Sequence, residues 1–146
     1  MTYKKIHIGE VGVDSGQILI CDPCYIDSQW KNEKLVSKPV EILFPDGKTE
    51  KVISCSKRWF ELIDKINKGE LKIIGDNGFK KAKSNFSYPA CAELTLTKGY
   101  GQLNYEMGHP GVGVVSESGY GDGCYPVIAT IDEKTNRIKE LKIVFF

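Results

Sequence analysis

Turn-forming residues divide this chain into short apolar segments, and that spacing restricts the folds that it can adopt. The clearest turn is Pro45-Asp46-Gly47-Lys48, in which proline fixes one backbone dihedral angle and glycine accepts a positive one. Apolar-rich segments flank this turn at 35–44 and 49–55. The pattern predicts a β-hairpin.

Most of the other apolar segments are also short, which is typical of β-strands. Gln17–Cys21 is apolar along nearly its whole length, so we expect a central strand that is buried on both faces. Residues 92–97 and 102–107 alternate apolar with polar side chains and predict a second hairpin. Further strands are predicted at 3–13, 71–74, 112–117, 125–131 and 138–145, with turns at 75–78 and 133–136.

One segment has the pattern of a helix. Lys57–Lys68 follows Ser56, which is placed to cap the helix N-terminus, and precedes Gly69, which is placed to end it. The apolar residues of the segment recur at helical spacing. They are Trp59, Leu62, Ile63 and Ile66.

We therefore predict an α+β fold, namely a β-rich, antiparallel, sandwich-like domain with one main helix at about 57–68. Residues 1–146 are expected to form a single domain, because this length buries enough surface without disulfides. A thioredoxin-like βαβ arrangement is the alternative. Hairpin signals outnumber crossover signals and favour the antiparallel fold.

The charge balance excludes some classes of partner. Lys and Arg number 20 against 19 Asp and Glu, so no global field attracts DNA, RNA or acidic membranes. No apolar run approaches the roughly 20 residues of a membrane span, and the first residues have no hydrophobic signal segment. The five cysteines are an odd number, which favours reduced thiols in the cytoplasm.

Cys21 and Cys24 form a C-x-x-C pair at the end of a predicted strand. A structural zinc site usually has two such pairs, and only one is present. A redox pair has its first cysteine at a helix N-terminus, but a helix is expected here only from about Ser28. We favour a packing role for Cys21 and expect no bound metal and no cofactor.

Hydrolytic chemistry is an open alternative. A nucleophile requires a neighbouring base, and Cys24 or Cys124 together with His109 supply a thiol and an imidazole. Asp14 and Asp122 are a second option, as a general acid and base. The sequence does not show that these residues meet.

Two glycine-rich loops, GHPGVGVV (108–115) and SGYGDGCYPV (118–127), flank a predicted strand. The amides of such loops can contact an anion or a small ligand, and tight turns explain the glycines equally well. Neither loop has the lysine and Ser/Thr pair of a P-loop or the context of a dinucleotide site. Tyr25, Tyr120 and Tyr125 lie in or beside the loops, where rings can stack on a base or a sugar.

Two segments, VGVDSGQILICDPCYI (11–26) and GVGVVSESGYGDGCYPV (111–127), resemble a family of small bacterial and phage proteins with a domain of unknown function. That family pairs a V-D-[SA]-G…D-P-x-Y start with a G-x-G-D-G-x-Y-P-V finish. The resemblance implies a shared site more than a named reaction, in the cytoplasm of a bacterial host cell. The positions that match are Asp14, Gly16, Asp22, Pro23, Tyr25, Gly121, Asp122, Gly123, Tyr125 and Pro126.

We predict that the strand end at 22–25 and the loop at 121–125 lie side by side and form one pocket. The expected ligand-binding residues are Asp14, Ser15, Asp22, Cys24, Tyr25, His109, Tyr120, Asp122 and Tyr125. The predicted function is binding of a small polar ligand without catalysis. The phage resemblance implies a nucleotide-like signal that is sequestered, with Arg58 or the lysines of 80–83 contacting its phosphates. The alternatives are a small hydrolase and a structural or protein-interaction module without a pocket, and self-association into a homo-oligomer stays open.

Overall fold

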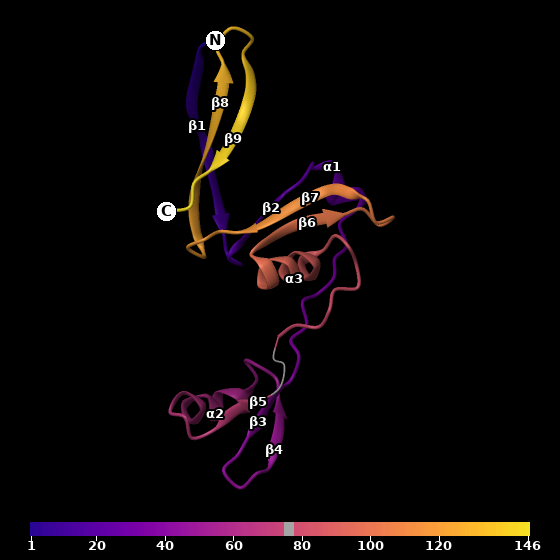
Figure 1. The fold of residues 1–146 in the computed structure, drawn as a ribbon, viewed down its shortest axis with the longest axis vertical. Helices are drawn as coiled ribbons and strands as arrows, with labels where there is room; N and C mark the ends of the chain where they lie inside the picture. The colour runs from indigo at the N-terminus through magenta and orange to yellow at the C-terminus, as the bar shows by residue number, and fades with distance from the viewer. Residues whose placement is uncertain (75–77) are drawn as a thin grey trace.

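The structure is a computed structural model that describes residues 1–74 and 78–146, and it has an α+β fold rich in antiparallel sheet (Figure 1). The predicted fold class is confirmed. The described strands form three separate three-stranded sheets, ordered β1-β8-β9, β2-β7-β6 and β4-β3-β5. Figure 1 shows the three sheets one after another along the long axis of the molecule, and a hydrophobic cluster accompanies each.

The first sheet consists of β1 (Tyr3–Val13), β8 (Gly123–Asp132) and β9 (Arg137–Ile143). β8 is the central strand, and both neighbours pair with it in antiparallel orientation. The predicted strands at 3–13, 125–131 and 138–145 are therefore confirmed, with ends that differ by one or two residues. A turn closed by a 2.7 Å hydrogen bond from the Asn136 amide to the Asp132 carbonyl joins β8 to β9.

The second sheet consists of β2 (Gln17–Ile20), β6 (Tyr100–Asn104) and β7 (Pro110–Glu117). The expectation that β2 is a central strand is wrong, because β7 lies between β2 and β6. Ile18 and Leu19 pack in two different clusters, so both faces of β2 contact core although the strand lies at an edge. Ile20 is 59% exposed.

Helix α3 (Tyr88–Lys98) packs on the second sheet, so the hairpin predicted from residues 92–97 and 102–107 is also wrong. The Ser87 hydroxyl caps the first turn of α3, and Gly99 ends the helix with a φ of 84°. These two end signals outweigh the alternation of leucines. Gly101 follows on β6, where the absence of a Cβ lets the Leu94 side chain lie against the strand.

The third sheet and its helix form an insert at residues 40–74. β3 (Val40–Leu43) and β4 (Thr49–Val52) make the predicted hairpin, and β5 (Lys72–Ile74) pairs with the other edge of β3. The predicted helix is confirmed as α2 (Lys57–Asn67). The Trp59 amide donates a 3.2 Å hydrogen bond to the Ser56 hydroxyl at its N-cap, and the Leu62 side chain is buried against the sheet.

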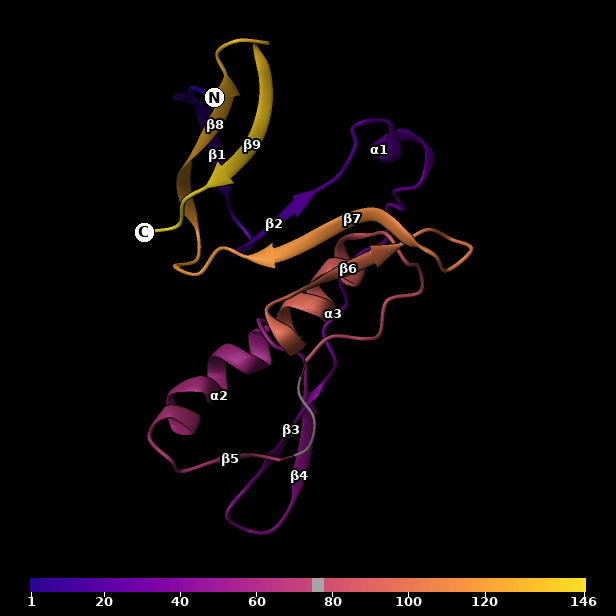
Figure 2. The same cartoon turned by 45° about the horizontal axis from the view of Figure 1, so that its top comes forward.

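Two connecting segments, residues 31–39 and 78–87, join the insert to the second sheet, and we call them the paired linkers (Figure 2). Hydrogen bonds of 2.7 Å run from the Lys38 amide to the Gly78 carbonyl and from the Lys80 amide to the Val36 carbonyl. Most of the turn predicted at 75–78 lies outside the described residues. In the described part of the chain, no helix has the length and apolar character needed to cross a membrane.

Candidate functional site

The nine ligand-binding residues predicted from the sequence fall into two groups at opposite ends of β2. Asp22, Cys24 and Tyr25 follow its C-terminal end. The loop that contains Asp122 contacts its N-terminal end, where the Gly16 amide donates a 2.8 Å hydrogen bond to Asp122 Oδ1. The strand alone separates these ends by about 10 Å. The prediction that residues 22–25 and 121–125 lie side by side and form one pocket is therefore wrong (Figure 1).

The antiparallel register explains this separation. β2 pairs with β7 from Gln17 opposite Glu117 to Ile20 opposite Val114. Residues that follow β7, including Asp122, therefore meet the start of β2, whereas His109, which precedes β7, lies toward the end where β2 finishes. The segments 11–26 and 111–127 do pair with each other, because Val11 lies opposite Tyr125 and Gln17 opposite Glu117, but the same register keeps Asp22 away from Asp122.

The group of predicted residues at the start of β2, which includes Asp122, stabilises a reversal of the chain. The Ser118 amide donates to the Gly16 carbonyl at 2.9 Å, and the buried Tyr125 hydroxyl donates to the Gly121 carbonyl at 2.7 Å. Tyr120 is 73% exposed, and Asp14 and Ser15 are exposed as well. A cavity of about 110 Å³ lined in part by Ser15 lies nearby, which is below the size of typical ligand sites.

The second group lies around helix α1 (Cys24–Ser28) and the hairpin between β6 and β7. The Tyr105 hydroxyl donates a 2.6 Å hydrogen bond to the Tyr25 hydroxyl, and the two rings meet edge to face. The His109 ring stacks on Tyr105, with 4.4 Å between ring centroids. The hydrogen bond with Tyr105 raises the pKa of Tyr25 to about 12, so the Tyr25 phenol stays protonated at neutral pH.

The thiol of Cys24 is not activated as a nucleophile. Its hydrogen bond with Asp22 raises the pKa of Cys24, and the Cys24 backbone amide lowers the pKa of Asp22 by donating to it at 3.0 Å. Helix α1 begins at Cys24 rather than near Ser28, but the neighbouring carboxylate governs the thiol. In residues 1–74 and 78–146, no hydrogen bond joins His109 to Cys24 or Cys124.

The Cys21 thiol faces the core at the end of β2. Cys21 packs against the cluster that includes buried Cys91, and burial raises the pKa of both thiols, that of Cys91 to about 11. This placement agrees with a packing role for Cys21 at the strand end.

A cavity of about 430 Å³ lies between the paired linkers and α3. Two further cavities lie at the paired linkers, next to the second group. One has a volume of about 450 Å³ and the other about 270 Å³, and both are lined by Glu33 and Lys83. Because they share these residues, the two cavities adjoin. The larger one is lined by Gln29, Lys31, Asn32, Glu33, Lys83, Ser84, Asn85, Phe86 and Glu106, and the smaller one by Glu33, Lys34, Val36, Lys80, Lys81 and Lys83.

Glu33 fixes the position of the wall between the cavities. Its carboxylate accepts hydrogen bonds from the Lys83 amide at 2.6 Å, from the Ser84 amide and hydroxyl at 3.2 and 2.6 Å, and from the Ser87 hydroxyl at 3.0 Å. The Ser84 hydroxyl and the Lys83 amide hold the pKa of Glu33 below its ordinary value, so the group is ionised at neutral pH. Ser87 also caps α3, which ties the cavity wall to that helix.

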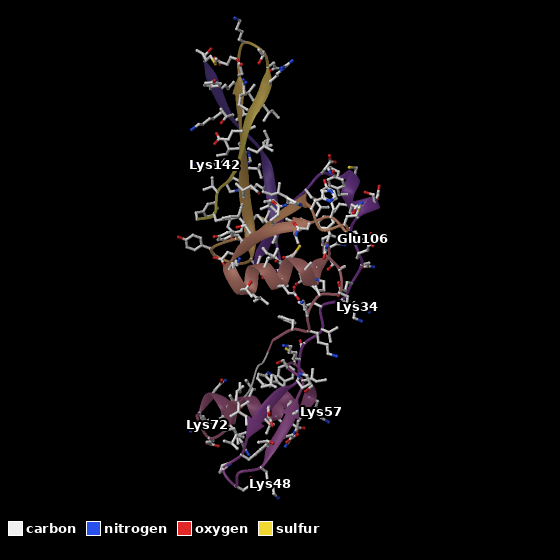
Figure 3. All side chains as sticks on the ribbon, turned by 45° about the vertical axis from the view of Figure 1, so that its right-hand side comes forward. Lys34, Lys48, Lys57, Lys72, Glu106 and Lys142 are labelled. Atoms are coloured by element: carbon white, nitrogen blue, oxygen red, sulfur yellow. The ribbon has the colours of Figure 1, made fainter. Side chains whose placement is uncertain are left out.

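Positive charge gathers on the linkers around these cavities. Five lysines line the two cavities, against the two carboxylates of Glu33 and Glu106. Within the described residues, none of these lysines forms an ion pair. Lys34 and Glu106 lie on the same side of the molecule in Figure 3. The smaller cavity, with four lysines and one carboxylate, therefore favours an anionic group, whereas the lysines and carboxylates of the larger cavity balance.

The larger cavity also offers an aromatic ring and amide side chains. Phe86 is buried and meets the Trp30 ring edge to face, with 5.0 Å between centroids. Asn85 Nδ2 donates a 2.9 Å hydrogen bond to the Tyr105 carbonyl, which links this cavity to the Tyr25–Tyr105 pair. The carbonyl oxygen of the Asn85 side chain and the side chains of Gln29 and Asn32 supply donors and acceptors for a polar ligand.

Sequence reasoning predicted only some of the residues that line these cavities. The lysines of 80–83 were expected to contact phosphates, and they do line a cavity. Arg58 was the other candidate, but it forms ion pairs of 2.9 Å with Glu50 and 3.2 Å with Glu61. Glu33 was not predicted. The repeated lysines of 31–34 and 80–83 were the available signal, but no sequence pattern shows that two segments 45 residues apart pair.

Comparisons with protein-family models, curated proteins and solved structures found no match to this chain. The resemblance of residues 11–26 and 111–127 to small phage proteins therefore stays a prediction. The candidate site rests on the geometry of the chain itself.

Proposed function

We propose that the protein binds a small phosphorylated molecule of the nucleotide class in the two adjoining cavities at the paired linkers. The convergence of five lysines from two distant segments on cavities that share Lys83 carries the proposal. Single phosphate-binding lysines are common on surfaces. Here the lysines lie on two segments that the Glu33 carboxylate joins through the Lys83 and Ser84 amides, which is a more specific arrangement.

The two cavities suit different parts of such a ligand. The smaller one, lined by Lys34, Lys80 and Lys81, suits the phosphates. The larger one suits the base and the sugar, because Asn32 and Asn85 can hydrogen-bond a base edge and Phe86 supplies apolar surface. Its volume of about 450 Å³ falls in the range of small-molecule sites.

The arrangement supports binding more than catalysis. Glu33, the carboxylate shared by both cavities, accepts four hydrogen bonds from the protein, and its lowered pKa makes it a poor general base. The outcome of binding would be sequestration of the ligand, as the sequence led us to expect.

A panel of mononucleotides, cyclic nucleotides and matching nucleosides tests the proposal by isothermal titration calorimetry. At least one phosphorylated member should bind, and its nucleoside should bind at least tenfold more weakly. After heat denaturation the ligand should be recovered intact, since an altered ligand would indicate an enzyme. Binding of nucleosides and nucleotides with equal affinity, or of neither, would contradict the proposal.

Two lysine variants locate the site. Lys83→Met removes a charge that lines both cavities, whereas Lys57→Met removes one from the start of α2, in the insert. Lys83→Met should weaken nucleotide binding about tenfold or more, and Lys57→Met should leave it unchanged. Equal effects of the two variants would place the ligand elsewhere.

A further inference from the structure

The paired linkers are joined at two places beside the smaller of the two cavities. Nearer the insert, the Lys80 amide donates a 2.7 Å hydrogen bond to the Val36 carbonyl. Nearer α3, the Lys83 amide donates a 2.6 Å hydrogen bond to the Glu33 carboxylate. Lys34 lies between Glu33 and Val36 in the sequence, so its backbone is held against the opposite linker. The cavity therefore has lysines on both sides without any rearrangement of the chain.

Positive charge is in excess around the smaller cavity. Among the described residues, its lining has four lysines and the single carboxylate of Glu33, which leaves a surplus of three positive charges. The lowered pKa of Glu33 keeps this carboxylate ionised at neutral pH, so it offsets only one lysine. In the part of the chain that the structure describes, none of the four lysines forms an ion pair. The lysines are Lys34, Lys80, Lys81 and Lys83.

The larger cavity has no such surplus. Its charged lining residues among those described are Lys31, Lys83, Glu33 and Glu106, so the two signs balance. The charged part of a ligand is therefore attracted to the smaller cavity and not to both. The volume of the smaller cavity, about 270 Å³, lies just below the roughly 300–1,000 Å³ of complete small-molecule sites. It fits one part of a ligand whose remainder occupies the larger cavity.

We propose that the ligand contains a diphosphate group, as a nucleoside diphosphate does, and that both of its phosphates lie in the smaller cavity. This inference rests on the proposed function. At neutral pH a phosphate monoester carries a charge of about −1.5 to −2, which leaves part of the lysine surplus unmatched. A second phosphate adds about one more negative charge and brings the ligand close to the surplus of three. The diphosphate therefore gains electrostatic attraction that the monophosphate lacks.

Isothermal titration calorimetry with a matched nucleoside, monophosphate and diphosphate tests this proposal, in buffer without divalent cations that would neutralise the phosphates. The diphosphate should bind the wild type about tenfold or more tightly than the monophosphate. Lys81 lines only the smaller cavity and Lys31 only the larger one. Lys81→Met should reduce the ratio of the two affinities to about threefold or less, because it removes one surplus charge. Lys31→Met should leave the ratio unchanged.

Lys31, Lys34 and Lys81 are exposed, so their methionine variants should retain the wild-type circular dichroism spectrum. Lys34→Met, on the opposite linker, should reduce the affinity ratio as Lys81→Met does. Equal affinities for monophosphate and diphosphate, both above that of the nucleoside, would overturn this inference and leave the proposed function intact. Equal affinities for all three would overturn both. A ratio that Lys81→Met and Lys34→Met leave unchanged, or that Lys31→Met reduces equally, would place the diphosphate elsewhere and also overturn the inference.

Discussion

Ser56 and Ser87 cap the two 11-residue helices in the same way, and this pair allows a controlled test of the cavity wall. Each hydroxyl accepts a 3.2 Å hydrogen bond from the third helical amide, that of Trp59 or Ala90. Ser87 differs because its hydroxyl, which is fully buried, also donates to the Glu33 carboxylate at 3.0 Å. Both Ser→Ala substitutions therefore remove an N-cap hydrogen bond, and only Ser87→Ala also removes a hydrogen bond to Glu33.

The expected magnitudes follow from these contacts. Ser56→Ala removes an N-cap hydrogen bond and should cost about 1 kcal/mol of unfolding free energy. Ser87→Ala removes the same kind of cap and also a partly buried hydrogen bond to a charged acceptor, which adds about 1.5 kcal/mol. The total for Ser87→Ala should be about 2.5 kcal/mol.

Urea unfolding followed by tryptophan fluorescence measures both effects. Trp30 packs on Phe86 beside the cavities, and Trp59 lies on α2 of the insert, so each tryptophan reports on the region of one cap. Single-tryptophan variants, Trp59→Phe and Trp30→Phe, separate the two signals. If Ser56→Ala and Ser87→Ala lower the unfolding free energy equally, the hydrogen bond from Ser87 to Glu33 contributes nothing to stability. Glu33 would then not tie the cavity wall to α3.

Two other predictions test the packing and the charge of the site. Hydrogen bonds from Ser84 and Lys83 lower the pKa of Glu33, so its ionised form stabilises the fold at neutral pH, and this contribution is lost as the pH falls below about 4 toward the folded-state pKa. The difference in melting temperature between wild type and Glu33→Gln should therefore be largest near pH 7 and shrink toward pH 3, and a constant difference would contradict this role. Gly101→Ala would place a Cβ 2.7 Å from Leu94 Cδ2 and should lower the unfolding free energy by about 1–3 kcal/mol. Gly12→Ala, where nothing lies within 4 Å of the added Cβ, should lower it much less. Equal melting temperatures for the two variants would argue against close packing of α3 on β6.

The sequence predicted elements whose ends carry strong local signals. Pro45 and Gly47 set the hairpin between β3 and β4, and Ser56 and Gly69 bound α2. For α3 the equivalent signals, Ser87 and Gly99, were present, but the alternating leucines favoured a strand. A helix that packs on a sheet over only part of its length does not require a strict apolar stripe, so periodicity was a poor guide there.

The site was harder to predict because it depends on which strands pair. Asp22 and Asp122 occur in motifs that look alike in the sequence, but the register of β2 with β7 places them at opposite ends of the strand. Lys31 and Lys83 lie on separate segments that meet through Glu33 and through the backbone of the paired linkers. Such long-range pairing is not encoded in local composition.

Amide chemical shifts during a nucleotide titration test the central claim most directly. The amides of Lys83 and Ser84 donate to Glu33 at the wall of both cavities, whereas the Gly16 amide donates to Asp122 in the other group of residues. A phosphorylated ligand bound at the paired linkers should shift the Lys83 and Ser84 signals and leave Gly16 in place. A shift confined to Gly16 and residues 118–125, or no shift at millimolar nucleotide, would contradict the account.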